Sequence, residues 1–64
     1  MPGLTVREQQ ILRLVAEGLT SREIAGSERS ERTIRNQLVR IYEKLEVNNA
    51  AAAVAVGFRR GVLQ

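Results

Sequence analysis

The 64-residue sequence contains no cysteine and no histidine, and its seven acidic residues are all glutamates, so it contains no aspartate either. Without cysteine and histidine there are no disulfides, no thiolate nucleophile and no ordinary zinc site. The glutamates are scattered, each has a basic residue nearby, and no glycine-rich phosphate loop is present. General acid–base catalysis would depend on isolated, solvated carboxylates. The composition therefore predicts a protein that is not an enzyme, has no metal or other cofactor and has no evident small-molecule ligand.

Long hydrophobic runs are also missing. No stretch approaches the ~18 apolar residues of a transmembrane helix, and the first residues lack the apolar segment of a signal peptide. The chain is nevertheless 44% hydrophobic, which is too much for a disordered protein. We expect residues 1–64 to form a single domain that is cytoplasmic and makes no membrane contact.

Positive charge is concentrated in the middle of the chain. The net charge is +3, and residues 29–44 hold five basic and two acidic side chains, which accounts for the whole excess. A basic cluster of this kind favours a polyanionic partner such as nucleic acid. From charge alone, a solvated helix surface with local salt bridges is an equally good interpretation.

Helical signals divide the chain into four segments. Thr5 with Glu8, and again Thr20 with Glu23, have the spacing of a capping box, and Gly18 suits the left-handed position after the first helix. Apolar residues recur with a helical period between these signals. We expect an all-α domain of four helices over about residues 5–17, 21–26, 31–45 and 49–60.

The start of the third helix has two possible positions, because residues 26–33 (GSERSERT) contain two N-cap candidates and no apolar side chain. Ser27 would begin a helix at Glu28, and Ser30 would begin one at Glu31. The residues alone leave both open, and the family resemblance given below favours Ser30, because it implies that a Ser-x-x-Thr sequence directly before the apolar stripe caps the third helix. Residues 26–29 then form the turn of a helix-turn-helix motif, between a short helix and a longer one.

The third helix has two unlike faces. One narrow apolar stripe is formed by Ile34, Leu38, Ile41 and Leu45. On a helical wheel of ~100° per residue, the opposite side carries Arg32, Arg35, Asn36, Val39 and Arg40. Arginine binds guanine in a bidentate manner, asparagine binds adenine likewise, and a valine methyl can contact the thymine methyl. This face suits the major groove of DNA, although an arginine-rich outer face is more often simply solvated.

The fourth helix is unusually apolar, with seven such residues in a row over residues 50–56. One stripe consists of Val47, Ala51, Val54 and Phe58, and a second stripe of small residues consists of Ala50, Ala53 and Gly57. Small side chains would let another helix approach closely, although alanine is also simply the best helix former. One domain cannot cover all sides of such a helix, so an exposed remainder would mark an interface.

Several segments resemble the LuxR/GerE-type DNA-binding domain. They are LTVRE (residues 4–8), ILRLVAEGLTSREIA (residues 11–25) and TIRNQLVRIYEKLEV (residues 33–47), and Ala53, Val54, Gly57 and Gly61 are similar to its last helix. The resemblance covers essentially the whole chain. It implies a bacterial-type transcription regulator whose third helix enters the major groove of double-stranded DNA, often as a homodimer formed through the fourth helix.

The resemblance also implies roles for individual residues. By position, Arg35, Asn36 and Val39 would read bases, Thr33 and Lys44 would contact the DNA backbone, and Arg22 is a further backbone candidate. The wheel adds Arg32 and Arg40 as phosphate contacts. The homodimer would use Ala50, Ala53, Val54 and Gly57.

The chain departs from the family pattern at two places that bear on function. The spacing from Ile24 to Thr33 is one residue shorter, and Ala50 replaces a frequent arginine. These departures support an alternative: a protein-interaction module of the same fold that binds or blocks a related regulator without reading DNA. The sequence also leaves open whether a sensor or receiver domain belongs with this one.

Overall fold

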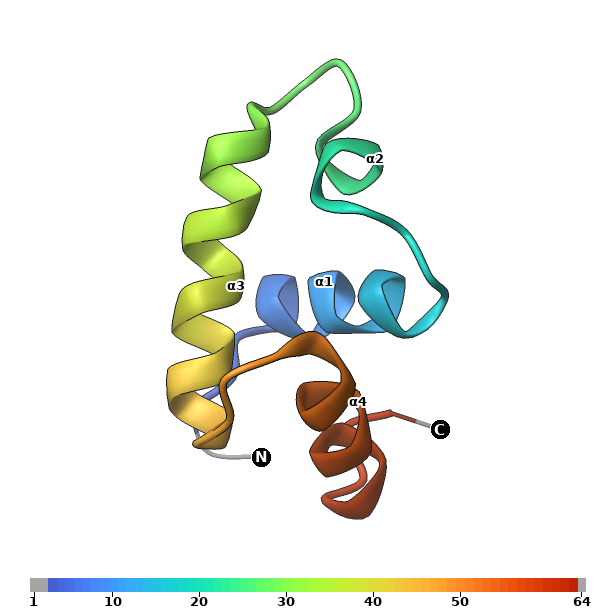
Figure 1. Ribbon diagram of the computed structural model, residues 1–64, viewed down its shortest axis with the longest axis vertical. Coiled ribbons are helices and arrows are strands. Elements are labelled where there is room, and N and C mark those ends of the chain that lie inside the picture. The colour runs from blue at the N-terminus through green and yellow to red at the C-terminus, as the bar shows by residue number, and fades with distance from the viewer. Residues whose placement is uncertain (1–2, 64) are drawn as a thin grey trace.

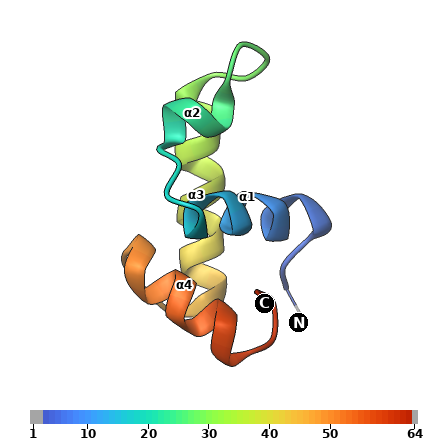
Figure 2. The ribbon, with the colours of Figure 1, turned by 90° about the vertical axis from the view of Figure 1, so that its right-hand side faces the viewer.

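The structure, a computed structural model, describes residues 3–63, which form four helices and no strand. The helices are α1 (Val6–Ala16), α2 (Ser21–Ala25), α3 (Glu31–Leu45) and α4 (Ala50–Arg59). α3 runs along the long axis, with α2 beside its first turns, α1 crossing it and α4 near its last turns (Figures 1 and 2). The fold is therefore all-α, as expected. None of the helices in residues 3–63 is long and apolar enough to cross a membrane.

Each helix begins at a side-chain cap that the sequence supplies locally. The caps are Thr5, Thr20, Ser30 and Asn49, all with extended backbone, and each side chain accepts a hydrogen bond from the amide three residues later. Ser30, not Ser27, caps α3, and residues 26–30 connect α2 to α3. The expected ranges of α1 and α4 included cap residues at both ends and that of α2 its C-cap, because a cap is only half inside its helix.

Three helices end in the same hydrogen-bonded motif. After α1, the amide of Gly18 donates to the carbonyl of Val15 at 2.9 Å and that of Leu19 donates to Leu14 at 3.1 Å, which is a Schellman motif. After α3, the amide of Glu46 donates to Glu43 at 3.1 Å and that of Val47 donates to Tyr42 at 2.9 Å. After α4, the amide of Gly61 donates to the carbonyl of Phe58 at 3.2 Å and that of Val62 donates to Gly57 at 2.9 Å. Gly18 has a φ of 95°, and the corresponding residue Glu46 has a φ of 59° although it is not a glycine.

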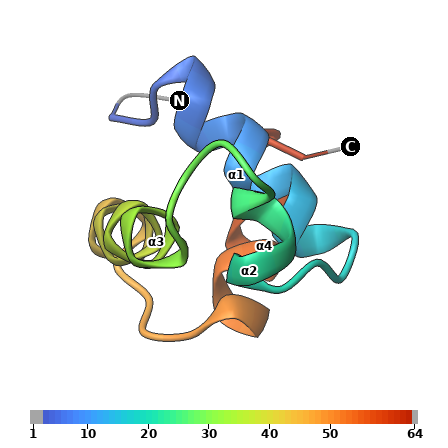
Figure 3. The same ribbon diagram turned by 90° about the horizontal axis from the view of Figure 1, so that it is seen from above.

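The hydrophobic core lies where α1, α3 and α4 meet. Its buried apolar residues are Leu4, Ile11, Leu12, Ala25, Ile34, Leu38, Ile41, Leu45, Ala53 and Leu63. All four residues of the α3 stripe are in this core, which confirms the inward face expected from their spacing. Because that stripe faces inward, the opposite side of α3 points away from the other three helices (Figure 3).

The orientation of α4 differs from the expectation. Ala53 and Gly57 of the small-residue stripe are buried, whereas Phe58 of the other stripe is 51% exposed. Gly57 packs against Leu63, which follows α4, and against Leu12 of α1, so closely that a Cβ there would lie 2.9 Å from Cδ1 of Leu63 and 3.2 Å from Cδ2 of Leu12. Ala53 and Gly57 are thus covered within their own chain, and the expected dimer contact through these two residues stays a prediction that their burial does not support.

Candidate nucleic-acid interface

The outer face of α3 is the main candidate site. Arg32, Arg35, Asn36, Val39 and Arg40, which we call the outer face, are all exposed. Val39 is 54% exposed, although valine is apolar, while Ile34 and Ile41 on the inner side of the same helix are fully buried. The core therefore fixes the rotation of α3, and this rotation holds the outer face toward solvent.

The first turn of α3 differs chemically from the first turns of α1 and α2. In those helices a glutamate three residues after the cap accepts a hydrogen bond from the cap amide, at 2.9 Å in Thr5 and 2.8 Å in Thr20. In α3 the corresponding residue is Thr33, whose hydroxyl lies 2.8 Å from the Ser30 hydroxyl. The first turn of α3 still carries one carboxylate, that of Glu31, as the first turns of α1 and α2 carry Glu8 and Glu23, so only the position of the charge differs among the three helices.

Arg35 is not free in solution but is paired with the carboxylate of Glu31. Its Nη2 lies 2.8 Å from Oε2 of Glu31, one helical turn earlier, and the two side chains are 67% and 40% exposed. The helical spacing predicts Arg35 on the outer face, but its partner Glu31 was not predicted. The spacing of four residues was the available signal, because glutamate and arginine at i and i+4 lie next to each other on a helix.

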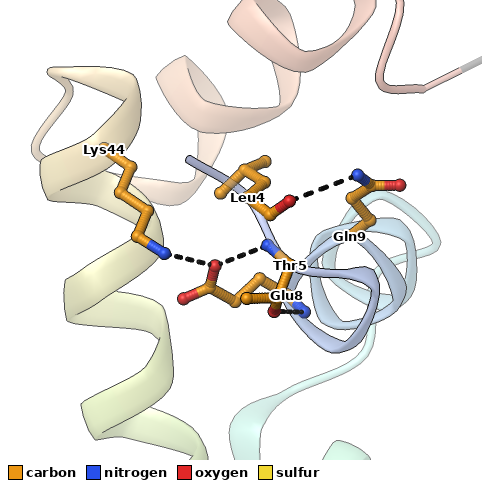
Figure 4. Close-up of polar contacts among 5 residues, drawn as sticks. All are labelled: Leu4, Thr5, Glu8, Gln9 and Lys44. Carbon is orange, nitrogen blue, oxygen red and sulfur yellow. Dashed lines mark hydrogen bonds and ion pairs between the residues drawn. The ribbon is translucent and has the colours of Figure 1, made fainter. Parts of the chain in front are cut away.

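Lys44, expected at the DNA backbone, makes a contact inside the protein. Its Nζ lies 2.7 Å from Oε1 of Glu8 (Figure 4), and the Glu8 side chain is only 9% exposed. Burial raises the pKa of the Glu8 carboxyl, but its hydrogen bonds with Lys44 and Thr5 and the charge of Lys44 lower it by more, so the net pKa lies below its ordinary value. Lys44 thus ties α3 to α1, and its role toward DNA stays a prediction.

Further hydrogen bonds lie around the Glu8 carboxylate at the start of α1. Oε1 of Glu8 also accepts from the Thr5 amide at 2.9 Å, while the Gln9 side-chain amide donates to the Leu4 carbonyl at 3.5 Å (Figure 4). The sequence identified Glu8 as half of a capping box, which is correct. It did not identify the second role, because Lys44 is 36 positions away.

The remaining expected DNA contacts are also accessible. Arg22 is exposed on α2, and Thr33 is exposed in the first turn of α3. α2 packs directly on α3, so these side chains belong to the two helices of the same helix-turn-helix unit. Among residues 3–63 no group of three or more histidine, cysteine, aspartate or glutamate side chains could hold a metal ion.

On α4, the outward surface contains only part of the expected dimer contact. Ala50 is exposed and Val54 is half-buried, so these two of the four expected dimer residues are accessible to some extent. Ala51 and Phe58 extend the same surface. We call Ala50, Ala51, Val54 and Phe58 the apolar surface of α4.

A short helix, a turn and a longer helix with a basic outer face define a helix-turn-helix domain of the kind found in DNA-binding proteins. The chain belongs to the luxR family of bacterial regulatory proteins, since the sequence model of that family, "Bacterial regulatory proteins, luxR family", matches residues 2–56. This finding confirms the family resemblance seen in the sequence.

Individual relatives are regulators. The chain is 39% identical to the transcriptional regulatory protein YdfI of Bacillus subtilis over 61 residues, 94% of this chain and 29% of that protein. It is 36% identical to the response regulator protein VraR of Staphylococcus aureus over 62 residues, 95% of this chain and 30% of that protein. The chain thus spans less than a third of the length of these relatives. No solved structure matches it significantly.

Proposed function

We propose that this protein binds double-stranded DNA in a sequence-specific manner and regulates transcription, with α3 in the major groove. The observation that carries the proposal is the outer face of α3, where three arginines, one asparagine and one exposed valine lie opposite a fully packed stripe. In helix-turn-helix proteins the second helix contacts base edges and the first crosses the DNA backbone. The family membership supports the same conclusion.

The proposed contacts with DNA are of two kinds, with phosphates and with base edges. Contacts with phosphates would provide affinity but little sequence information. The residues proposed for these contacts are Arg32, Arg40, Arg22, Thr33 and Lys44. Arg35 would bind a guanine, Asn36 an adenine, and Val39 a thymine methyl. The cytoplasm, where a bacterium keeps its DNA, is the expected site of action.

We further propose that two copies associate through the apolar surface of α4 and place two α3 helices on two half-sites. This surface lies on a different helix from the outer face, so a dimer would leave α3 free to bind DNA. Ala51→Glu should abolish a dimer without harming the fold, because Ala51 is exposed and a carboxylate near a helix N-terminus is favourable. Light scattering after size exclusion measures this, and the control is Val6→Glu, which adds a carboxylate at the start of α1, where Val6 is 70% exposed.

The experiment that tests DNA binding is in vitro selection of sites from a random pool, followed by fluorescence anisotropy titrations on the selected duplex. An enriched palindrome would support both base reading and a symmetric dimer. Arg35→Ala should cost about 1–3 kcal/mol on the best site and relax the preference at one position. Arg40→Ala should weaken binding to all duplexes about equally and make the salt dependence shallower.

The matched control is Arg13→Ala, which removes the same charge from the last turn of α1, on the far side of the molecule from α3 (Figures 1 and 3). It should bind almost as tightly as the wild type at moderate salt. If the wild-type protein enriches no sequence and shifts no duplex even at low salt, DNA reading is refuted. A dimer that behaves in this way would instead be the protein-interaction module considered above.

A further inference from the structure

The pairing of Glu31 with Arg35 places a carboxylate beside the only arginine that is expected to read a base. Glu31 is the first residue of α3, and its Oε2 lies 2.8 Å from Nη2 of Arg35. Arg32 and Arg40, the expected phosphate contacts on the same face, have no ion pair within residues 3–63. The carboxylate therefore distinguishes Arg35 from the other two arginines of the outer face.

Stability does not account for this pair. Both side chains are well exposed, at 67% and 40%, and exposed ion pairs of this spacing contribute little to folding. The pair has a clearer effect on Arg35 itself. Its guanidinium has five N–H donors in a rigid plane, and the hydrogen bond to Glu31 uses one of them, so a bidentate contact with guanine remains possible.

The pair also changes what Arg35 is attracted to. An unpaired arginine at the edge of a groove can turn to the nearest phosphate, because phosphates surround the groove and attract any cation. Arg35 and Glu31 together are neutral, and the carboxylate repels phosphates. A base edge with two acceptors, such as O6 and N7 of guanine, then becomes the better partner.

We propose that Glu31 is a positioning residue that holds Arg35 on the base edge and off the phosphates, and so determines specificity at that base pair. The inference rests on the proposed function, since it assumes that α3 reads DNA. Glu31 needs no direct contact with DNA for this role.

The test compares Glu31→Ala, Arg35→Ala and the double variant on two duplexes. One is the selected site, and the other carries one changed base pair where Arg35→Ala loses its preference. The wild type should discriminate roughly 5- to 150-fold between them, the range for one bidentate contact. In Glu31→Ala, the ratio of the affinities for the two duplexes should fall most of the way to one. In the double variant it should fall no further than in Arg35→Ala alone.

Affinity should change in the opposite direction from specificity. Glu31→Ala should bind random DNA more tightly, and the slope of log K against log salt should steepen by about 0.9 for each phosphate that Arg35 newly contacts. Glu31→Gln, which keeps the size of the side chain, serves as a second variant with the same expectation. Circular dichroism spectra establish that each variant is folded.

Glu28→Ala is the matched control, because it removes the same charge from the adjacent turn, where Glu28 is exposed. It should keep the full wild-type ratio. If Glu28→Ala loses the ratio as Glu31→Ala does, or if Glu31→Ala binds both duplexes more tightly by the same factor, the positioning role is overturned and Glu31 only repels DNA. A wild type without any sequence preference overturns the proposed function itself, before any variant is compared.

Discussion

Replacing Glu46 with glycine should stabilise the protein. Glu46 has φ 59° and ψ 43°, a left-handed conformation that costs a residue with a Cβ about 1–2 kcal/mol. Glycine avoids this cost but loses more backbone entropy on folding, about 0.5–1 kcal/mol. Removing a carboxylate from the negative end of α3 adds at least ~0.3 kcal/mol. The expected net gain in the free energy of unfolding is about 1 kcal/mol.

Thermal unfolding followed by circular dichroism is the direct assay. For a domain of this size, 1 kcal/mol corresponds to an increase in Tm of about 4–8 °C. Urea unfolding should give the same gain through the midpoint with an unchanged m-value, since the substitution exposes no additional surface. Glu46 lies outside the outer face, so binding to the selected duplex should be unaffected.

Two control variants separate the backbone effect from the charge effect. Glu46→Ala removes the carboxylate but keeps a Cβ, so it should gain only a few tenths of a kcal/mol. Gly18→Glu is the reciprocal change in the same motif after α1, where a Cβ would meet nothing within 4 Å, and it should lose about 1 kcal/mol. If Glu46→Ala raises the free energy of unfolding as much as Glu46→Gly does, or if Gly18→Glu leaves it unchanged, backbone strain at Glu46 is not the cause of the gain.

Three further predictions concern other contacts. Gly57→Leu should lose about 1–3 kcal/mol or more in urea unfolding because Leu63 already fills the space, whereas Ala55→Leu on the exposed side of α4 should not. Ser30→Ala should lose about 1 kcal/mol by the same measurement, since the α3 cap is removed. The contribution of ionised Glu8 to the free energy of unfolding should be complete above its ordinary pKa of 4.5. It should disappear as the pH falls through the lower pKa that Glu8 has in the folded protein. Wild type and Glu8→Gln, compared in urea unfolding across this range, should therefore converge in acid, and a constant difference would contradict the assignment.

Features that depend on neighbouring residues were predictable from the sequence. The caps of α1 and α2 require only a threonine and a glutamate three residues apart. The choice of Ser30 over Ser27 rested on the family resemblance, which implies a cap in the Ser-x-x-Thr sequence directly before the apolar stripe, and it is confirmed. The inner face of α3 followed from a strict helical spacing, and the accessibility of its outer face followed from the inner one.

Features that depend on distant segments were not predictable in this way. In the observed orientation of α4, Gly57 packs against Leu12 of the distant helix α1 as well as against Leu63, and nothing in the periodicity of residues 50–59 signals the contact with α1. An alanine-rich helix also has no single apolar stripe, because small apolar residues occur on all its sides. The pairing of Lys44 with Glu8 joins two helices across 36 positions. Its detection requires knowledge of how α1 crosses α3.

The local caps have a kinetic consequence. The hydrogen bonds that begin all four helices join residues only three positions apart, so each helix start can form before any tertiary contact. Proteins rich in local contacts fold in microseconds to milliseconds. We therefore expect rapid refolding after dilution from denaturant.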